Sequence, residues 1–372
     1  MSRKITGLQH KSGNSWAIDK RIKGVGRIFQ RFEASSKEEA ELTFFTILAE
    51  AQAQADRKKM GIHSFREAAT KYLSEITKKS LNRDADSLRI LDPFIGDYPL
   101  DNIHQGTLQS FIDKRRSKNI KSGTVKRDLA VVRRILTLAS RVWRDNEGRP
   151  WLTTAPPLLE MPNWEDAAEP YPLSWTEQEK LFNALPVHLE KMALFAINTG
   201  LREQGVCWLR WQWEVKIPEL NTSVFIIPGK PREYSDGRWP GEKNKEDQVV
   251  VLNSITQTLI DQQRELHPDY VFPCRGKRIT RLHTNGWKAA WKRAGLPQGK
   301  EYTKGPHNLK HTFGRRLRAA GVALETRKVL LHHTVGDITT HYSPAELMEL
   351  IDAVEKITDP KIQQVTILRK AA

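Results

Sequence analysis

Three short segments in the second half of the chain combine a cation or an imidazole with residues that start helices. They are Thr199-Gly-Leu-Arg202, His307-Asn-Leu-Lys-His-Thr-Phe313 and Leu331-His-His333, and Tyr342 follows the last of them by nine residues. Fixed cations suit chemistry at a phosphate, because they stabilise the negative charge that develops on its oxygens. A phenol becomes a nucleophile when a nearby base or positive field helps to remove its proton. Each segment alone is a weak signal, and their combined order and spacing carry the information.

The charge of the chain favours the same class of partner. Its 372 residues include 60 Lys and Arg against 44 Asp and Glu, a formal net charge of +16, on a background of 39% hydrophobic residues. This background is that of a globular chain. A large positive charge favours a polyanion, usually nucleic acid, because each neutralised phosphate releases condensed counterions. Binding to a membrane surface, or solubility alone, are the alternatives.

Several classes of protein are excluded by what the sequence lacks. Only Cys207 and Cys274 occur, without a C-x-x-C pair, which argues against a disulfide framework and a cysteine-rich zinc site. Neither a signal peptide nor a run of about 18 apolar residues is present. Walker A and dinucleotide glycine motifs are absent too, which argues against NTP-driven motors and nicotinamide enzymes. We therefore expect a cytoplasmic protein without a membrane segment.

The first 60 residues predict a small sheet followed by a helix. Residues 14–33 interleave basic and apolar side chains around Gly24 and Gly26, and a capping-box-like start at Ser36 opens a helix that runs to about residue 57. Candidate DNA contacts here are Lys20, Arg21 and Lys23. A solvated sheet edge whose lysines discourage aggregation is the alternative.

Residues 64–143 predict a helical bundle. An apolar stripe at Leu129, Val132, Leu136 and Ala139 has helical spacing. A basic stretch at 114–121 falls at a helix end, where helix N-termini and lysines can hold phosphates. The candidate DNA contacts of this region are Lys114, Arg115, Lys121 and Lys126, and a solvated loop is the alternative for the stretch.

A linker and a third region follow. Six prolines between positions 150 and 172 exclude a helix or a central strand. Beyond them the patterns predict helices from residue 176 and over 189–198, strands at 223–228 and 248–252 around a polar loop, and helices over 284–357. Residues 345–357 have amphipathic spacing, and 365–368 can extend as a strand.

In this order and spacing, with Lys243-Asn-Lys245 between the two predicted strands, the segments resemble the tyrosine recombinase (lambda-type phage integrase) family. The resemblance is strong over 174–357 and weaker before it. It implies a multidomain α+β protein: a small β-sheet-plus-helix N-terminal domain, a helical-bundle core-binding domain and a mainly α catalytic domain with a small antiparallel sheet. The implied boundaries are an arm-type DNA-binding domain at 1–62, a core-binding (SAM-like helical) domain at 63–150, a linker at 151–173, the catalytic domain at 174–357 and a tail at 358–372, which is exchanged between subunits in related recombinases.

The resemblance also assigns roles. It makes Tyr342 the nucleophile that forms a 3′-phosphotyrosine, and it implies Arg202, Lys310 and His333 around the phosphate. His307 is the candidate base and Lys243 the acid that protonates the leaving 5′ oxygen. Because the phosphotyrosyl bond conserves the cleaved linkage, neither ATP nor another cofactor is implied. A zinc cluster at the adjacent histidines is rejected, because neighbouring His residues rarely share one tetrahedral site.

Two positions depart from the family pattern. Lys310 stands where a second arginine is usual, so the charge is kept but the planar fork of donors is lost. Gly205 stands where an acidic residue usually supports the first arginine, and Glu203 is a candidate replacement. These departures sustain an alternative function, a catalytically weakened recombinase remnant that acts as a site-specific DNA-binding protein.

The implied function is DNA integration or excision of a prophage or another mobile element. Its implied partners are double-stranded DNA attachment sites, three further copies of the chain in a homotetramer on DNA, and a host DNA-bending protein and an excisionase. A type IB topoisomerase would share the chemistry, but the additional N-terminal module and the modest length disfavour it. A generic RNA-binding protein ranks last, because no RNA-module signature is present.

Overall fold

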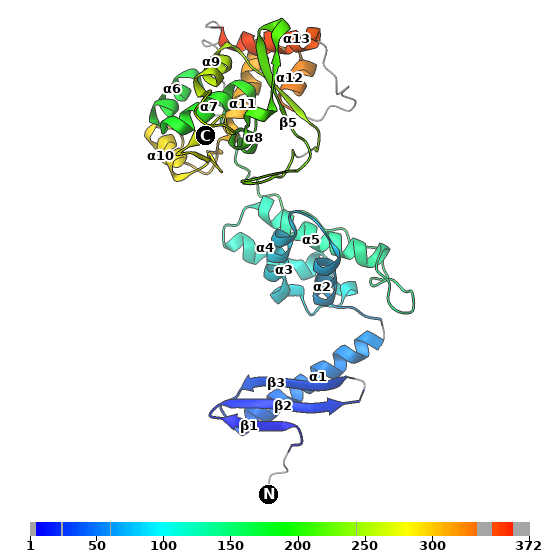
Figure 1. Cartoon of the computed structure of the whole chain (residues 1–372). Helices are drawn as coiled ribbons and strands as arrows, with labels where there is room; N and C mark the ends of the chain where they lie inside the picture. The colour runs from blue at the N-terminus through cyan, green and yellow to red at the C-terminus, as the bar shows by residue number, and fades with distance from the viewer. Residues whose placement is uncertain (1–4, 24, 60, 243, 333–343, 360–372) are drawn as a thin grey trace. The chain divides into compact units, whose positions relative to one another are not determined.

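A computed structural model describes residues 5–23, 25–59, 61–242, 244–332 and 344–359. It divides into two compact units, residues 1–167 and 168–372, whose elements are labelled in Figure 1. Each unit is described by itself. Within the described residues no helix is both long and apolar enough to cross a bilayer.

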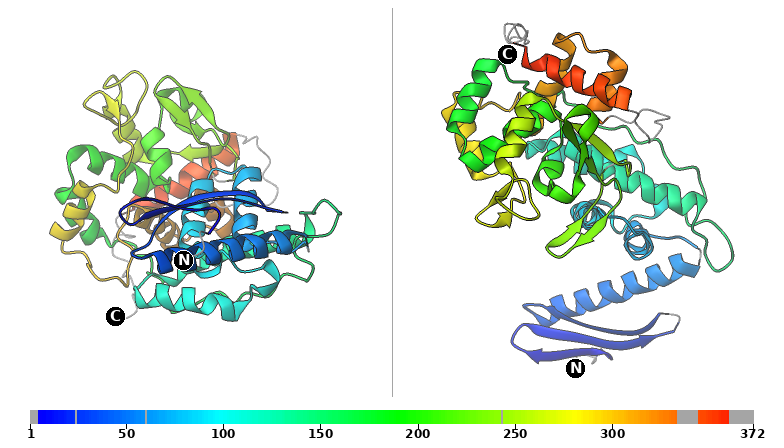
Figure 2. Two further views of the ribbon diagram at one scale, coloured as in Figure 1. Left: turned by 90° about the horizontal axis from the view of Figure 1, so that it is seen from below. Right: turned by 45° about the horizontal axis from the view of Figure 1, so that its top comes forward.

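The N-terminal module is a three-stranded antiparallel sheet with one helix. Its strands β1 (Leu8–Ser12), β2 (Ser15–Ile22) and β3 (Gly26–Glu33) are ordered β1-β2-β3, and α1 (Lys37–Lys59) follows. Figure 2 shows α1 lying along one face of the sheet. The two strands predicted within 14–33 and the helix after Ser36 are confirmed. β1 was missed because its mostly exposed, polar residues show no hydrophobic alternation.

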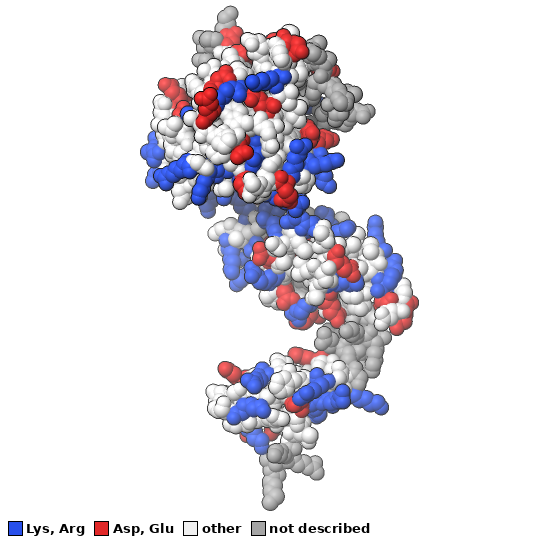
Figure 3. All heavy atoms as spheres, in the orientation of Figure 1, with Lys and Arg blue, Asp and Glu red and all other residues white. Residues whose placement is uncertain are grey.

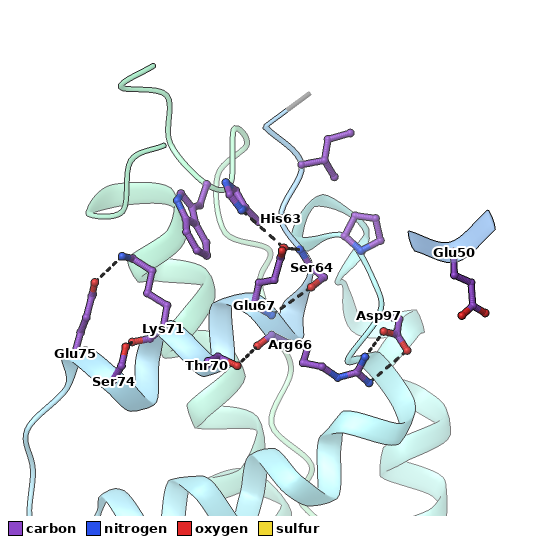
Figure 4. Close-up of a pocket in the computed structure, with 13 residues that line it drawn as sticks. Glu50, His63, Ser64, Arg66, Glu67, Thr70, Lys71, Ser74, Glu75 and Asp97 are labelled. Atoms are coloured by element: carbon purple, nitrogen blue, oxygen red, sulfur yellow. Dashed lines mark hydrogen bonds and ion pairs between the residues drawn. The ribbon is translucent and has the colours of Figure 1, made fainter. Parts of the chain in front are cut away.

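Four helices form the rest of the first unit. They are α2 (Phe65–Glu75), α3 (Leu81–Ile95), α4 (Gln105–Ser117) and α5 (Ser122–Arg141). Ser64 and Glu67 form a capping box at the start of α2, drawn in Figure 4. The predicted stripe of α5 is fully buried in the core of the bundle. Residues 151–167, which carry much of the proline-rich linker, contain no helix or strand.

The second unit surrounds a small antiparallel sheet with helices. The sheet has the order β4-β5-β8, and the pairs β6-β7 and β9-β10 form two separate two-stranded sheets. The strands predicted at 223–228 and 248–252 are confirmed as β5 and β8, but the loop between them contains the β6-β7 hairpin, which was not predicted. The bounds are α6 (Trp175–Ala184), α7 (Val187–Thr199), α8 (Glu203–Trp208), β4 (Glu214–Ile217), β5 (Thr222–Ile227), β6 (Arg232–Tyr234), β7 (Gly237–Trp239), β8 (Gln248–Val251), α9 (Ser254–Gln263), β9 (Pro273–Cys274), β10 (Lys277–Arg278), α10 (Asn285–Arg293), α11 (His307–Ala319), α12 (Leu324–Leu330) and α13 (Pro344–Glu355).

Aromatic residues fill the core next to the β6-β7 hairpin. Trp208, Trp213 and Trp239 are buried together in the core of the second unit. The guanidinium of Arg210 lies 4.0 Å from the ring centre of Tyr234 and also pairs with Asp236 of the hairpin turn. These contacts hold the β6-β7 hairpin against the core. The loop of residues 240–247 follows the hairpin directly in the sequence.

The predicted fold class is confirmed in general terms, since the chain is mixed helix and sheet with small antiparallel sheets. The finer division into arm-type, core-binding and catalytic domains stays a prediction. The amphipathic segment at 345–357 is the helix α13, which buries Leu347, Leu350 and Val354 against its own unit. The predicted strand at 365–368 lies outside the described residues.

Candidate active site

Arg202 is positioned by a sharp turn between two helices. α7 ends at Gly200, whose φ of 65° is left-handed. A Cβ at Gly200 would lie 2.4 Å from the ring of Phe313 in α11, so only glycine permits this close packing. Arg202 follows as the residue that precedes α8. The Thr199-Gly-Leu-Arg202 segment therefore forms a tight turn, and this turn lets the end of α7 pack against α11.

The carboxylate next to Arg202 comes from Glu242, which sequence reasoning missed. Arg202 Nη1 lies 3.5 Å from Glu242 Oε2. The side chain of Glu242 is buried, whereas the side chain of Arg202 is 33% exposed. The backbone of Glu242 is held in place by a hydrogen bond, because its N–H donates to the carbonyl of Gly229 at 2.8 Å. Arg202 is thus oriented by one buried carboxylate and remains open to a ligand.

Glu203 has a different task from the one expected. Its Oε1 accepts hydrogen bonds from the backbone N–H groups of Leu282 and His283, both at 2.7 Å. At position 205 a Cβ would meet the side chain of Leu201 at 2.9 Å. Leu201 therefore crowds the site where an acidic side chain would start, and Glu242 takes over the pairing.

Lys310 is buried and bound to the backbone. Its Nζ donates to the carbonyls of Gly200 at 2.8 Å and Leu331 at 2.7 Å, and the residue is only 5% exposed. Burial is the largest cause that lowers the pKa of Lys310 to about 7; the charge of Arg202 acts in the same direction, and Glu242 opposes the shift. Lys310 thus ties the turn before Arg202 to the end of α12, and its charge is sensitive to pH near neutrality.

His307 is the first residue of α11 and is exposed. Partial desolvation lowers the pKa of His307, and the nearby His311, Lys310 and Arg202 lower it further. The rings of His307 and His311 lie edge to face, with centroids 4.7 Å apart. A lowered pKa keeps the imidazole neutral near pH 7, the state in which it can accept a proton.

Three of the predicted residues, Lys243, His333 and Tyr342, lie outside the described residues. Their neighbours in sequence are nevertheless informative. Glu242, next to Lys243, pairs with Arg202, and Leu331, two residues before His333, accepts from Lys310. The described chain before both gaps therefore reaches the cluster of Arg202, His307 and Lys310.

The basic residues of the N-terminal sheet lie on two faces. Lys20 Nζ is 5.3 Å from the ring centre of Phe44, a buried residue of α1, so Lys20 faces the helix. Because side chains alternate along a strand, Arg21 lies on the opposite face, and its directly paired residue Arg27 shares that face. Arg31, paired with Ala17, lies there as well.

Sequence reasoning therefore missed two arginines of this face, Arg27 and Arg31, although strand alternation would have found them. Both are exposed, as are Arg21 and Lys23. Figure 3 shows Lys and Arg side chains distributed over the N-terminal module.

The predicted basic residues of the helical bundle also differ from one another. Lys114 and Lys121 are exposed and Lys126 is partly exposed. Arg115 instead pairs with the buried Asp128 at 3.0 Å, with a side chain only 15% exposed. The N-terminus of α5, a predicted phosphate position, already holds a carboxylate, because the backbone N–H of Ser122 donates to Asp166 at 2.7 Å.

A hollow beside α2 is lined by charges that already have partners. Figure 4 shows Lys71 paired with Glu75 and Arg66 paired with Asp97. His63 stacks on Trp151 with ring centroids 3.7 Å apart. Since these side chains hold each other, the hollow is not the candidate site.

Known proteins support the assignment of the second unit. Residues 174–347 match the model of the phage integrase family. A tyrosine recombinase XerC-like protein of Caldanaerobacter subterraneus subsp. tengcongensis is 28% identical over 49% of this chain and 52% of its own length. The integrase of Salmonella phage P22 is 25% identical over 53% of this chain and 47% of its own length. The chain thus spans about half the length of the curated relatives it matches.

Solved structures resemble the fold over a larger share of the chain. A lambda integrase tetramer bound to a Holliday junction matches with a TM-score of 0.56 at 13% identity, over 92% of this chain and 99% of that one. The Tn1549 transposon integrase in complex with transposon right end DNA matches with a TM-score of 0.56 at 15% identity, over 78% and 99%. These likenesses concern the fold. Residues 174–347 are thus similar to the phage integrase family, and the fold of the chain is similar to that of the solved integrases.

Proposed function

We propose that the chain is a site-specific DNA recombinase that cuts and rejoins DNA through a 3′-phosphotyrosine and integrates or excises a prophage or other mobile element. The observation that carries the proposal is the cluster of Arg202, His307 and Lys310. Arg202 lies close enough to affect the pKa values of both other residues, although it is more than 100 positions away in sequence. A cluster of cations beside a neutral imidazole suits a phosphate under attack.

Each member of the cluster has a role in this chemistry. Arg202 stays charged and offers a fork of donors to the non-bridging oxygens. His307, neutral because its pKa is lowered, takes the proton of the attacking Tyr342 hydroxyl. Tyr342 then bonds to phosphorus while Lys243 gives a proton to the departing 5′ oxygen. Rejoining reverses these steps with a 5′ hydroxyl as the nucleophile, so no nucleotide hydrolysis is needed.

Lys310 contributes less directly than the arginine usual at its position. Two of its three N–H donors are used by the carbonyls of Gly200 and Leu331. The remaining donor and the charge are available to the phosphate, and the two carbonyl bonds hold the Arg202 turn against α12. We assign His333 to the phosphate together with Lys310.

DNA binding is proposed for the first unit as well. Residues 1–62 would bind arm-type sites through the outer face of the sheet, which carries Arg21 and Arg31; Arg27 on the same face is paired with Asp19 at 2.7 Å. Residues 63–150 would hold the core site, with Lys114, Lys121 and Lys126 as phosphate contacts. Arg115 and Lys20 are assigned to packing, because the first is paired with Asp128 and the second covers Phe44.

In the proposed assembly four subunits hold two DNA duplexes, and strands exchange through a Holliday junction in the bacterial cytoplasm. A host DNA-bending protein and an excisionase would assist, and residues 358–372 would dock on a neighbouring subunit. The chain 174–357 would form the catalytic domain, preceded by the linker 151–173.

A nicked suicide substrate carrying the element's attachment core tests the proposal. Wild type is expected to form an SDS-resistant protein–DNA adduct that Tyr342→Phe abolishes. A weakened remnant would instead bind the site without an adduct, and Lys310→Arg would restore one. If neither wild type nor Lys310→Arg leaves an adduct, the proposed chemistry is wrong.

A further inference from the structure

The chain enters the second unit as an extended segment that lies along α11. Prolines at 170 and 172 favour extended backbone for themselves and for the residues before them. The backbone N–H of Tyr171 donates to Asn308 Oδ1 at 3.0 Å, and that of Leu173 donates to Thr312 Oγ1 at 2.9 Å. Two residues further on, the guanidinium carbon of Arg316 lies 3.4 Å from the ring centre of Trp175.

These contacts are in register. Every second residue of the segment, at 171, 173 and 175, meets every fourth residue of α11, at 308, 312 and 316. Two residues of extended chain advance roughly 6–7 Å, and four residues of helix advance about 6 Å. The two repeats therefore match, and the segment follows one face of α11 for two helical turns.

The segment is held at both ends. At its start, the backbone N–H of Glu169 donates to the carbonyl of Glu301 at 2.7 Å, and that of Thr303 donates back to Glu169 at 2.8 Å. At its end, Ser174 caps α6 in a capping box with Glu177. Movement of residues 169–175 against α11 would break several bonds at once.

The partners on α11 have little freedom. Asn308 and Thr312 are 1% exposed, and Arg316 is 6% exposed. Nη2 of Arg316 is buried without a hydrogen-bond partner among the described residues, and the ring of Trp175 gives the guanidinium a favourable cation–π contact.

We infer that residues 169–175 form a strap that sets the position of α11, and that Asn308, Thr312 and Arg316 are positioning residues for His307 and Lys310. Asn308 is the immediate neighbour of His307, and Thr312 lies two residues beyond Lys310 on the same rigid helix. The strap is also the first segment of the second unit, directly after the end of the first unit at residue 167. The inference rests on the proposed function for its effect on catalysis.

Thr312→Val tests the strap, since it keeps the size of the side chain and removes the acceptor for Leu173. It also removes the hydrogen bond that the Thr312 hydroxyl donates to the carbonyl of Asn308 within α11 at 2.8 Å. At saturating suicide substrate we expect the single-turnover cleavage rate to fall about tenfold, because small displacements of catalytic groups are costly, while the dissociation constant for DNA stays unchanged. Thr312→Ser restores the hydroxyl and should return the rate to within about twofold of wild type. Thr222→Val is the matched control, because it removes one hydrogen bond between β5 and α9 instead.

A second measurement does not depend on turnover. The pH titration of the His307 ring, followed by NMR in the full chain, should have a shifted midpoint in Thr312→Val and the wild-type midpoint in Thr312→Ser and Thr222→Val. If wild type forms the adduct, and Thr312→Val has the same cleavage rate and the same His307 titration midpoint, the positioning role of the strap is refuted and the proposed function stands. If wild type forms no adduct, the proposed function fails, and the His307 midpoints decide the strap: a shift supports it and an unchanged midpoint overturns it.

Discussion

The cations of the second unit and those of the N-terminal sheet are held in opposite ways. Lys310 is buried with two carbonyl partners, and Arg202 is oriented by a buried carboxylate. Arg21 and Arg31 are exposed on an open sheet face. Catalysis requires groups fixed where charge develops, whereas binding to a phosphate backbone requires mainly charge and tolerates mobile side chains. Under the proposed function the same residue types would serve two purposes, catalysis where they are held by buried partners and DNA binding where they are exposed.

Of the variants considered, removal of the Arg202 side chain should have the largest effect on the cleavage rate. Arg202→Ala is expected to lower the single-turnover cleavage rate by about 10²- to 10³-fold, the usual cost of one donor to a transition-state oxyanion. DNA affinity should change little, because one phosphate contact among many is lost. The control is Arg318→Ala, an exposed arginine at the end of α11. Equal losses of rate in the two variants would show that Arg202 acts only as surface charge.

Lys310→Met tests whether the buried ammonium is costly to keep. The pKa of Lys310 is about 7 in the folded chain and ordinarily near 10.5, so between these values the unfolded state binds more protons. Stability due to this group therefore rises with pH above about 7 and is constant well below it. Relative to Lys310→Met, wild type should gain about 2 kcal/mol of unfolding free energy in the second unit between pH 6.5 and 8.5.

Urea unfolding at the two pH values measures this difference. Arg202 and Glu242 remain in both proteins, so their contributions to stability largely cancel in the comparison. A difference between wild type and Lys310→Met that does not change with pH would mean that Lys310 keeps an ordinary pKa, and the account of its burial would be wrong.

The smallest effects are expected on the N-terminal sheet. Arg31→Ala should weaken binding to arm-type DNA several-fold at low salt and reduce the slope of log affinity against log salt by about one. Cleavage of a core-site substrate should not change. Lys20→Ala, on the α1 side of the sheet, should leave the salt slope unchanged. Fluorescence anisotropy at several salt concentrations measures both, and equal slopes for Arg31→Ala and wild type would refute the assignment of the outer face.

Regular elements were the predictable part of the structure. The stripe of α5 and the strands β5 and β8 follow from local periodicity, and prolines marked the linker. Arg202, His307 and Lys310 were predicted from resemblance, and the structure brings them together. The roles of Lys243, His333 and Tyr342 stay predictions.

Long-range pairings were not predictable. Glu242 as the partner of Arg202, the carbonyls bound by Lys310, and the strap on α11 each join segments that no local pattern connects. Arg115 illustrates the same limit, since its basic neighbours are exposed while it pairs with Asp128. Charge in a sequence indicates a partner, but tertiary packing decides whether that partner is DNA or the protein itself.

Peptide mapping of the covalent adduct tests the central claim most directly. After nuclease and trypsin digestion of the trapped complex, mass spectrometry should find the nucleotide remnant on the peptide spanning residues 329–356, in which Tyr342 is the only tyrosine of the chain's seven. A remnant on that peptide, absent from Tyr342→Phe, is the predicted result. A remnant on a peptide containing any other tyrosine would contradict the assignment of the nucleophile and of the site built around it.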